Sequence, residues 1–290
     1  MRRQELPGTA PPVLVGGARP DDRPTVFEAK LDGWASQQRS RQLRSTTIDP
    51  RERSTPAGLG EAEDGPDRRP MSRHELQAFF DHADGRVQRT VDGGRKGAMA
   101  ALRDTMMFKV MYAYGLRRGE VVRLDVPDLR PDPRVPQWGR YGSLHVRHAG
   151  SAGGSPPGER VVLSLPEFDW AVEGLRQWVE LARPRMRGEA YPALWLTERA
   201  SRVTGSYLDR RFAELRDELG FAKDLVPECL RQSYIAHLID VGCPEPFVRA
   251  QVGHAVSSAT AAAPPAGDGF RNAVPARMSD RAGAHREGGP

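Results

Sequence analysis

The chain has few lysines and few cysteines. Only four of its 43 basic residues are lysines, so arginine carries nearly all of the positive charge. The two cysteines, Cys229 and Cys243, are too few for a disulfide framework or for a four-cysteine zinc site. Cysteine usage therefore favours a reducing, cytoplasmic location.

Long apolar runs are also absent. No stretch approaches the roughly 18 consecutive apolar residues of a membrane-spanning helix. The N-terminal segment MRRQELPGTAPPVLVGG has a basic start but no apolar core of signal-peptide length. We therefore expect no membrane partner and no secretion signal.

The residue type in excess is arginine. The 43 Lys and Arg residues outnumber the 38 Asp and Glu residues, which gives a net charge of +5. A guanidinium group binds phosphate through two parallel hydrogen bonds, so this excess favours an anionic partner such as nucleic acid. A solvated arginine-rich surface that reflects only GC-rich coding is the alternative, and charge alone does not separate the two.

Composition divides the chain into three parts. Residues 1–70 and 256–290 are rich in proline, glycine and charge without periodicity, so we expect them to be largely disordered. One amphipathic helix is expected near 27–45. Residues 71–255 contain the regular hydrophobic patterns and are expected to form the folded domain.

The folded part contains helices, then a hairpin, then more helices. Ser72 and Glu75 have the spacing of a capping box, which starts a helix by satisfying exposed backbone N–H groups. A second helix covers 101–115 and stops at a glycine, and two strands, 143–148 and 160–165, flank a turn rich in Gly and Pro. Further helices are expected over 166–183, over 206–219 behind a Ser206 and Asp209 cap, and over 228–241. The fold class is therefore mainly α with a small β-hairpin or sheet.

Two arginines and a histidine are candidates for an anion site. Arg117 lies between two helices, the second of which begins near Arg118, and backbone N–H groups at a helix start favour anions. Arg231 opens one helix and His254 ends the next, so a helical hairpin could bring both to a common point. Guanidinium groups would neutralise charge on a phosphodiester, and the imidazole would donate a hydrogen bond. The simpler alternative for Arg117 is a surface pair with Glu120.

The segments YAYGLRRGEVVRLDVPDL and LRQSYIAHLIDVGCPEPFVRAQVGH, with the hairpin between them, resemble the catalytic domain of tyrosine recombinases, the phage integrase family. The resemblance covers roughly residues 70–260 in unbroken order and looks closest to actinobacterial integrases. It implies DNA strand transfer through a 3′-phosphotyrosyl link, with double-stranded DNA and other recombinase protomers as partners and with no metal or other cofactor. The first arginine of the family falls on Arg117, the second on Arg231, and the Gly-His pair on Gly253 and His254.

At three positions the chain lacks a residue that the family uses for catalysis. Glu228 replaces the histidine of His-x-x-Arg, and a carboxylate can accept a proton but repels phosphate when it is ionised. Gly153 lies in the hairpin turn where the family lysine protonates the leaving 5′ oxygen, and the nearby Arg160 is too basic to donate a proton. Ala263 replaces the nucleophilic tyrosine, and no tyrosine follows Tyr234 in the sequence.

These features leave three hypotheses. In the first hypothesis, the chain is an integrase-family domain for site-specific DNA recombination and integration that binds DNA phosphates without cleaving the strand. Alternatively it is a non-catalytic DNA-binding protein that occupies recombination sites or joins intact recombinases, or an inert remnant that keeps only the fold. A helix-turn-helix repressor fits poorly, because a hairpin separates the helical blocks. Only the helix near 27–45 corresponds to the core-binding domain of the family, so we expect weak DNA affinity.

Overall fold

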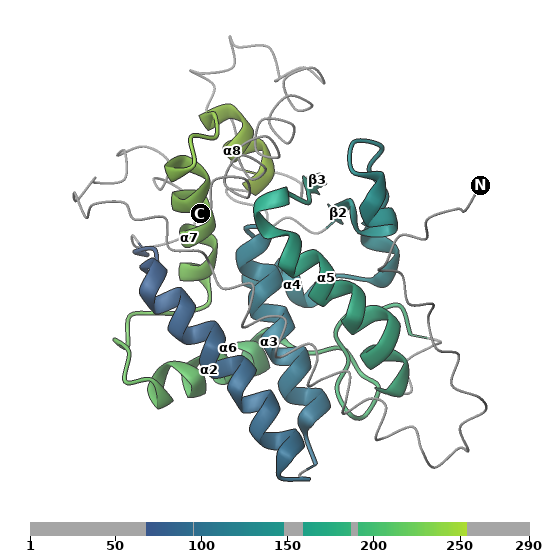
Figure 1. The fold of residues 1–290 in the computed structure, drawn as a ribbon, viewed down its shortest axis with the longest axis vertical. Helices are drawn as coiled ribbons and strands as arrows, with labels where there is room; N and C mark the ends of the chain where they lie inside the picture. The colour runs from purple at the N-terminus through teal and green to yellow at the C-terminus, as the bar shows by residue number, and fades with distance from the viewer. Residues whose placement is uncertain (1–67, 95, 148–158, 187–190, 254–290) are drawn as a thin grey trace, which may run out of the picture.

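Figure 1 shows the computed structural model of the protein, which describes residues 68–94, 96–147, 159–186 and 191–253. The helix expected near 27–45 and nearly all of the segments expected to be disordered, 1–70 and 256–290, lie outside these residues. Those expectations and the expected domain limits, 71–255, stay predictions. Within the described residues, no helix has the length and hydrophobicity needed to cross a membrane.

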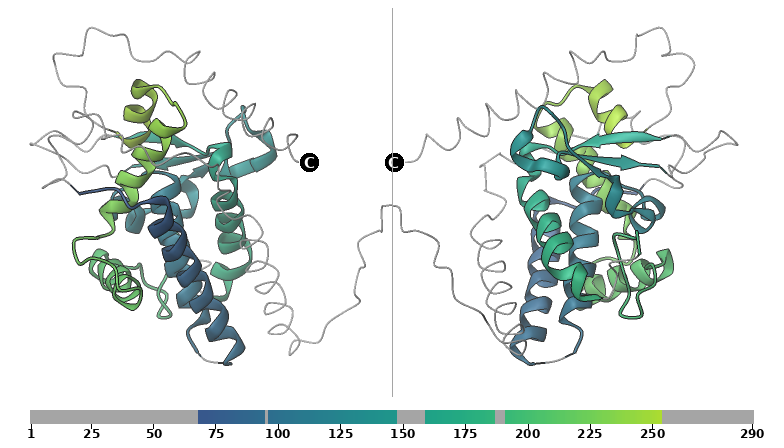
Figure 2. Two further views of the ribbon diagram at one scale, coloured as in Figure 1. Left: turned by 60° about the vertical axis from the view of Figure 1, so that its left-hand side comes forward. Right: turned by 90° about the vertical axis from the view of Figure 1, so that its right-hand side faces the viewer.

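Helix α2, Arg73–Asp92, begins at the capping box expected from the sequence. The Ser72 hydroxyl accepts a hydrogen bond from the Glu75 backbone N–H at 3.1 Å. In return, the Glu75 carboxylate accepts one from the Ser72 N–H at 2.8 Å. One face of the helix is apolar, and its buried residues include Phe79 and Phe80. That face lies along α3 (Figures 1 and 2).

Helix α3, Ala98–Ala113, is the central helix of the domain. Residues on all of its faces are buried, including its charged ones, which is typical of a helix enclosed by neighbours. The buried charges have partners. Arg103 donates to the carboxylate of Asp104 at 2.8 Å, and the Lys109 ammonium donates to Asp84 at 2.8 Å. Buried charges persist in folded proteins when they are paired in this way.

A small antiparallel sheet lies across one end of the helices (Figure 2). The expected hairpin is present as β2, Ser143–Val146, and β3, Arg160–Leu163, and Leu144 pairs with Val162. The sequence did not predict the third strand, β1, Leu129–Arg130, which pairs with the other side of β2. A strand of two residues is too short to show the alternation of apolar and polar residues by which strands are predicted.

The remaining helices follow the expected order. The segment expected as one helix over 166–183 is divided into a 3₁₀ turn, helix α5 and a π-helical turn. The α-helices are α4 (Arg118–Arg123), α5 (Asp169–Gln177), α6 (Gly205–Glu218), α7 (Glu228–Asp240) and α8 (Glu245–Val252). The cap of α6 differs from the expectation. Thr204 has an extended backbone and its side chain accepts from the Tyr207 N–H, so Ser206 lies inside the helix.

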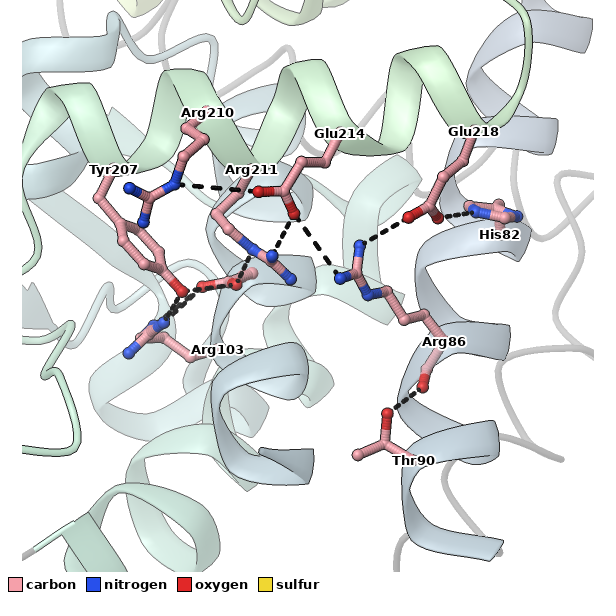
Figure 3. Close-up of polar contacts among 10 residues, drawn as sticks. His82, Arg86, Thr90, Arg103, Tyr207, Arg210, Arg211, Glu214 and Glu218 are labelled. Atoms are coloured by element: carbon pink, nitrogen blue, oxygen red, sulfur yellow. Dashed lines mark hydrogen bonds and ion pairs between the residues drawn. The ribbon is translucent and has the colours of Figure 1, made fainter. Parts of the chain in front are cut away.

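Polar contacts as well as apolar ones hold α6 against α2 and α3 (Figure 3). The carboxylate of Asp104 on α3 accepts hydrogen bonds from the Tyr207 hydroxyl at 3.0 Å and from Arg211 at 2.8 Å. Farther along α6, Glu218 pairs with Arg86 at 3.2 Å and with His82 at 2.7 Å, both on α2. Charges of alternating sign therefore run the length of this interface.

Candidate functional site

The junction between α3 and α4 positions the first candidate arginine. Helix α3 ends at Ala113, and Gly115, with φ of +57°, follows two residues later. The N–H groups of Gly115 and Leu116 bond back to the carbonyls of Tyr112 and Met111. This left-handed glycine ending satisfies the last carbonyls of the helix. The chain then reverses into α4, with Arg117 as the residue before its first turn.

Glu120 lies in the first turn of α4 and is the centre of a group of charges. Its side chain is only 1% exposed. One carboxylate oxygen accepts from the Arg117 backbone N–H at 2.8 Å, and the other lies 3.4 Å from the Arg117 guanidinium. Arg160, at the start of β3, donates to both oxygens, at 2.6 and 2.7 Å. The pair between Arg117 and Glu120, which is the alternative interpretation from the sequence, is present but buried on the Glu120 side, and at 3.4 Å it is longer than the pair between Arg160 and Glu120.

The pKa of Glu120 reports the balance of charge at this point. Burial alone would raise the pKa of the carboxyl, but the hydrogen bonds and charge of Arg160 hold it below its ordinary value. The Arg117 N–H and the charge of Arg231 lower it further. Arg117 and Arg160 contact Glu120, and Arg231 contacts the carbonyl of Gly115, two residues before Arg117. We refer to these three arginines as the arginine cluster.

Arg231 belongs to the first turn of α7, as the sequence predicts. Its guanidinium donates to the Gly115 carbonyl at 2.6 Å, which ties α7 to the end of α3. The side chain is completely buried, so a phosphate could reach it only after the groups that cover it move. Arg117 is 16% exposed and is the more accessible of the two.

Arg160 also contacts the last turn of α8. Its Nε donates to the backbone carbonyl of Gln251 at 3.0 Å. The Gln251 side chain in turn accepts from the Leu163 N–H at 2.9 Å, and its amide nitrogen lies 3.3 Å from the Leu163 carbonyl oxygen. Gly253, which ends α8 with φ of +70°, has no room for a side chain, since a Cβ there would lie 2.8 Å from the Arg160 side chain.

The structure brings together two of the six site residues expected from the sequence, Arg117 and Arg231. Glu228 is the half-buried first residue of α7, one turn before Arg231. Gly153, His254 and Ala263 lie outside the described residues, so their roles stay predictions. Helix α8 ends at Val252, two residues before His254, and its last turn is held by the bond from Arg160 to the Gln251 carbonyl.

Sequence reasoning missed two members of the site. The sequence indicates for Arg160 only that it is too basic to donate a proton, whereas in the structure it donates to both carboxylate oxygens of Glu120. Gln251 had no role at all. The available signal was weak: Arg160 is a charged residue at the start of an apolar strand, and its partner is 40 positions away.

The tyrosines bear on any strand-cleavage chemistry, and all six lie in the described part of the chain. They are Tyr112, Tyr114, Tyr141, Tyr191, Tyr207 and Tyr234. Burial raises the pKa of Tyr114 to about 12 and that of Tyr234 well above its usual range. Only Tyr191, with 43% exposure, is an exposed tyrosine. Tyr191 lies near the C-terminal end of α4. The carbonyl of the next residue, Pro192, accepts a hydrogen bond from the N–H of Val126, three residues after α4.

The family model described as "Phage integrase family" matches residues 69–262, more than half of the chain. The chain belongs to the phage integrase family. The match includes the whole arginine cluster and stops one residue before Ala263. The fold expected from the resemblance, mainly helical with a small sheet, is confirmed.

Curated tyrosine recombinases are similar to this integrase-family chain. XerC of Chromohalobacter salexigens is 31% identical over 174 residues, which is 60% of this chain and 52% of that protein. XerC of Mycobacterium sp. strain KMS is 28% identical over 194 residues, 66% of this chain and 59% of that protein. The chain thus spans between half and three fifths of these relatives. A crystal structure of XerA recombinase, 20% identical, has a TM-score of 0.47 and covers 67% of this chain and 59% of that one.

Proposed function

We propose that this integrase-family protein binds the phosphates of double-stranded DNA through Arg117 and Arg231 and does not cleave the strand. The observation that carries the proposal is the distribution of tyrosines. The family position falls on Ala263, and five of the six tyrosines are buried or half-buried in the fold. Without a phenol at the phosphate, no phosphotyrosyl bond can form.

The arginine cluster supports the proposal that the protein binds DNA phosphates. Arg117 and Arg160 pair with Glu120, and the charge of Arg231 also lowers the pKa of that carboxyl. The four groups together carry two net positive charges. Arginine neutralises charge on the non-bridging oxygens of a phosphodiester, but its pKa is too high for it to protonate a leaving oxygen. With Gly153 in the position of the family lysine, the cluster can hold a phosphate but lacks a proton donor of its own. A DNA partner would also place the protein in the cytoplasm.

The role that follows is occupation of recombination sites, alone or beside intact recombinases. A second identical chain cannot supply the nucleophile, because it lacks the tyrosine as well. An intact recombinase bound to the same DNA could supply one. The protein would then act as a non-cleaving member of a mixed assembly.

The first experiment tests cleavage. The full chain is incubated with sheared, nicked DNA from the source organism, so that the unknown site is present, and then denatured. We expect no protein-linked DNA. If an adduct forms, mapping the linked peptide and repeating the assay with Tyr191→Phe identify the residue, and the cleavage-deficient proposal is wrong.

The second experiment tests binding. We expect Arg117→Ala to weaken duplex DNA binding and to lower the slope of log affinity against log salt by about 1, the share of one phosphate contact. The pair Arg117→Ala with Arg231→Ala should lower it further. Fluorescence anisotropy over a salt series measures both, and circular dichroism confirms that the variants fold. Unchanged affinity in the double variant would mean that Arg117 and Arg231 do not bind DNA phosphate. Absence of binding by the wild-type chain at low salt would leave only the inert-remnant hypothesis.

The third experiment restores chemistry. Ala263→Tyr combined with Gly153→Lys returns a nucleophile and a proton donor to the positions that the family pattern indicates. We expect protein-linked DNA from this variant and none from the same variant carrying Arg117→Ala. Absence of an adduct from the restored chain would place the alignment of the last segment in doubt.

A further inference from the structure

The C-terminal end of α4 carries a second group of arginines, distinct from the arginine cluster. Arg202 donates to the carbonyls of Val122 and Leu124 at 3.2 and 3.0 Å, so its guanidinium closes the end of this helix. Arg123, between these two residues in the chain, is an exposed residue of the last turn. It follows Arg117 by the length of α4, about 9 Å at 1.5 Å per residue.

Two carboxylates hold two arginines of this group in place. Asp125 accepts from Arg202 at 2.5 Å and from Arg147 at 2.6 Å, and Asp128 accepts from Arg147 at 2.5 Å. The side chains of Asp125 and Asp128 are 16% and 4% exposed, whereas those of Arg147 and Arg202 are 34% and 30% exposed. The negative charge is therefore the more buried, and the positive charge faces the solvent.

Two exposed arginines, Arg123 and Arg140, add charge that no carboxylate balances in the part of the chain that the structure describes. The Arg140 guanidinium donates to the carbonyl of Val126 at 3.1 Å, in the turn that follows α4. Four guanidinium groups and two carboxylates thus give this surface two net positive charges. We refer to its four arginines as the α4 patch: Arg123, Arg140, Arg147 and Arg202.

The exposed face of α4 is also open. Gly119 lies one turn before Arg123 on this face, and a Cβ there would have nothing within 4 Å. A strand of nucleic acid that passes over α4 meets no side chain at this position. Successive phosphates of one duplex strand rise by about 3.4 Å, so the length of α4 corresponds to roughly three phosphates.

We propose that the α4 patch is a second contact surface for the sugar-phosphate backbone of duplex DNA. The guanidinium fork matches the oxygens of a phosphate, and contacts with the backbone do not depend on base sequence. Asp125 and Asp128 orient two of the four arginines before a ligand arrives. The proposal rests on the proposed function for its DNA partner, but it does not require the buried Arg231 to reach a phosphate.

The test measures binding of the full chain to a duplex oligonucleotide of arbitrary sequence over a salt series. Arg123→Ala combined with Arg140→Ala removes two exposed cations and leaves no carboxylate without its partner. We expect the slope of log affinity against log salt to fall by about 2, one for each phosphate contact. Unchanged affinity and slope would overturn the proposal, and this is also the result expected if the patch binds an acidic protein segment.

A second variant keeps every arginine. In Gly119→Glu, the new carboxylate lies one turn before Arg123, where a Glu and Arg pair at i, i+4 favours the helix. The same carboxylate repels phosphate on this face. We expect a melting temperature equal to or above that of wild type together with weaker DNA binding. Wild-type affinity in this variant would overturn the proposal as well.

Arg89→Ala combined with Lys96→Ala is the matched control. Both residues are exposed, one in the last turn of α2 and the other in the turn before α3. This end of the helices lies away from the sheet, whereas Arg147 of the α4 patch directly follows β2 (Figure 2). We expect the control to keep the wild-type salt slope. An equal loss would mean that binding follows total charge, and the α4 patch would have no special role.

The proposed function and the role of the α4 patch fail separately. If Arg117→Ala with Arg231→Ala leaves binding unchanged and Arg123→Ala with Arg140→Ala weakens it, the α4 patch stands and the phosphate-binding role of the arginine cluster is wrong. The reverse result overturns the α4 patch alone. If the wild-type chain does not bind DNA at low salt, both are wrong.

Discussion

Gly115 is the residue on which the geometry of the candidate site depends most directly. It ends α3 in a left-handed conformation, and its carbonyl accepts the bond from Arg231. A Cβ at this position would lie 2.5 Å from the Tyr234 ring and 3.0 Å from Val252. The contact among α3, α7 and α8 therefore requires the absence of a side chain here.

Gly115→Ala should destabilise the protein by roughly 2 to 5 kcal/mol, because a positive φ costs about 1 to 2 kcal/mol and overpacking about 1 to 3 kcal/mol. Gly119→Ala is the control. Gly119 lies within α4 with nothing near its added Cβ, so we expect a change between zero and about 1 kcal/mol of stabilisation. Urea unfolding of both variants measures the difference. Equal stabilities would mean that the site tolerates a side chain at Gly115.

Local signals in the sequence predict most helices and strands, but they do not predict which side chains from distant parts of the chain pair with each other. The capping box at Ser72, the glycine end of α3 and the hairpin depend on neighbouring residues, so the pattern contains them. The pair between Arg160 and Glu120 depends on how β3 packs beside α4, which no local pattern encodes. The same is true of the amide of Gln251.

At the scale of an element, α6 shows how a helix can be held by charge as much as by apolar contact. Phe212 packs on Phe79 with ring centroids 4.9 Å apart, and the α6 residues that form ion pairs, among them Arg211 and Glu214, precede and follow Phe212 in the sequence. Asp104 is 5% exposed and lies at the centre of these contacts. Its carboxylate pairs with Arg103 and Arg211 and accepts a hydrogen bond from the Tyr207 hydroxyl. Removing it would leave buried guanidinium groups without their main counterion.

Asp104→Asn should therefore cost about 3 to 5 kcal/mol, the usual penalty for breaking one side of a buried ion pair. Hydrogen exchange should rise in α6 more than in α5. Asp240→Asn is the control, because Asp240 and Arg73 are 63% and 53% exposed and 4.0 Å apart, and such pairs contribute less than about 1 kcal/mol. A similar loss in both variants would contradict the central role of Asp104.

At the scale of the whole molecule, carboxylates are paired with arginine throughout the described fold. The pKa of Asp125, for example, stays below its ordinary value because hydrogen bonds from Arg202 and Arg147 outweigh the effect of burial. Hydrogen bonds from Arg69 are the main cause of the pKa of about 2 at Glu75, against an ordinary value of 4.5. In acid, the unfolded chain binds protons at such groups before the folded chain does.

Stability should therefore fall as the pH drops from 4.5 toward 2, the interval between the unfolded and folded pKa values of Glu75. Glu75→Gln keeps a residue suited to the capping box but removes the charge. We expect it to be less stable than wild type at about pH 6 and to approach wild type as the pH falls toward about 2. Urea unfolding across this range measures the difference. Glu245→Gln, at an exposed position, should show a smaller change, and a pH-independent deficit in Glu75→Gln would contradict the linkage.

The contact between Gln251 and Leu163 has a consequence for association. Strand β3 is an outer strand of the sheet, and an outer strand offers bare peptide groups to which a strand of another molecule can attach. The primary amide of Gln251 faces the Leu163 N–H and carbonyl much as a peptide group of a fourth strand would. The side chain of a helix thereby blocks intermolecular β-sheet growth at this position.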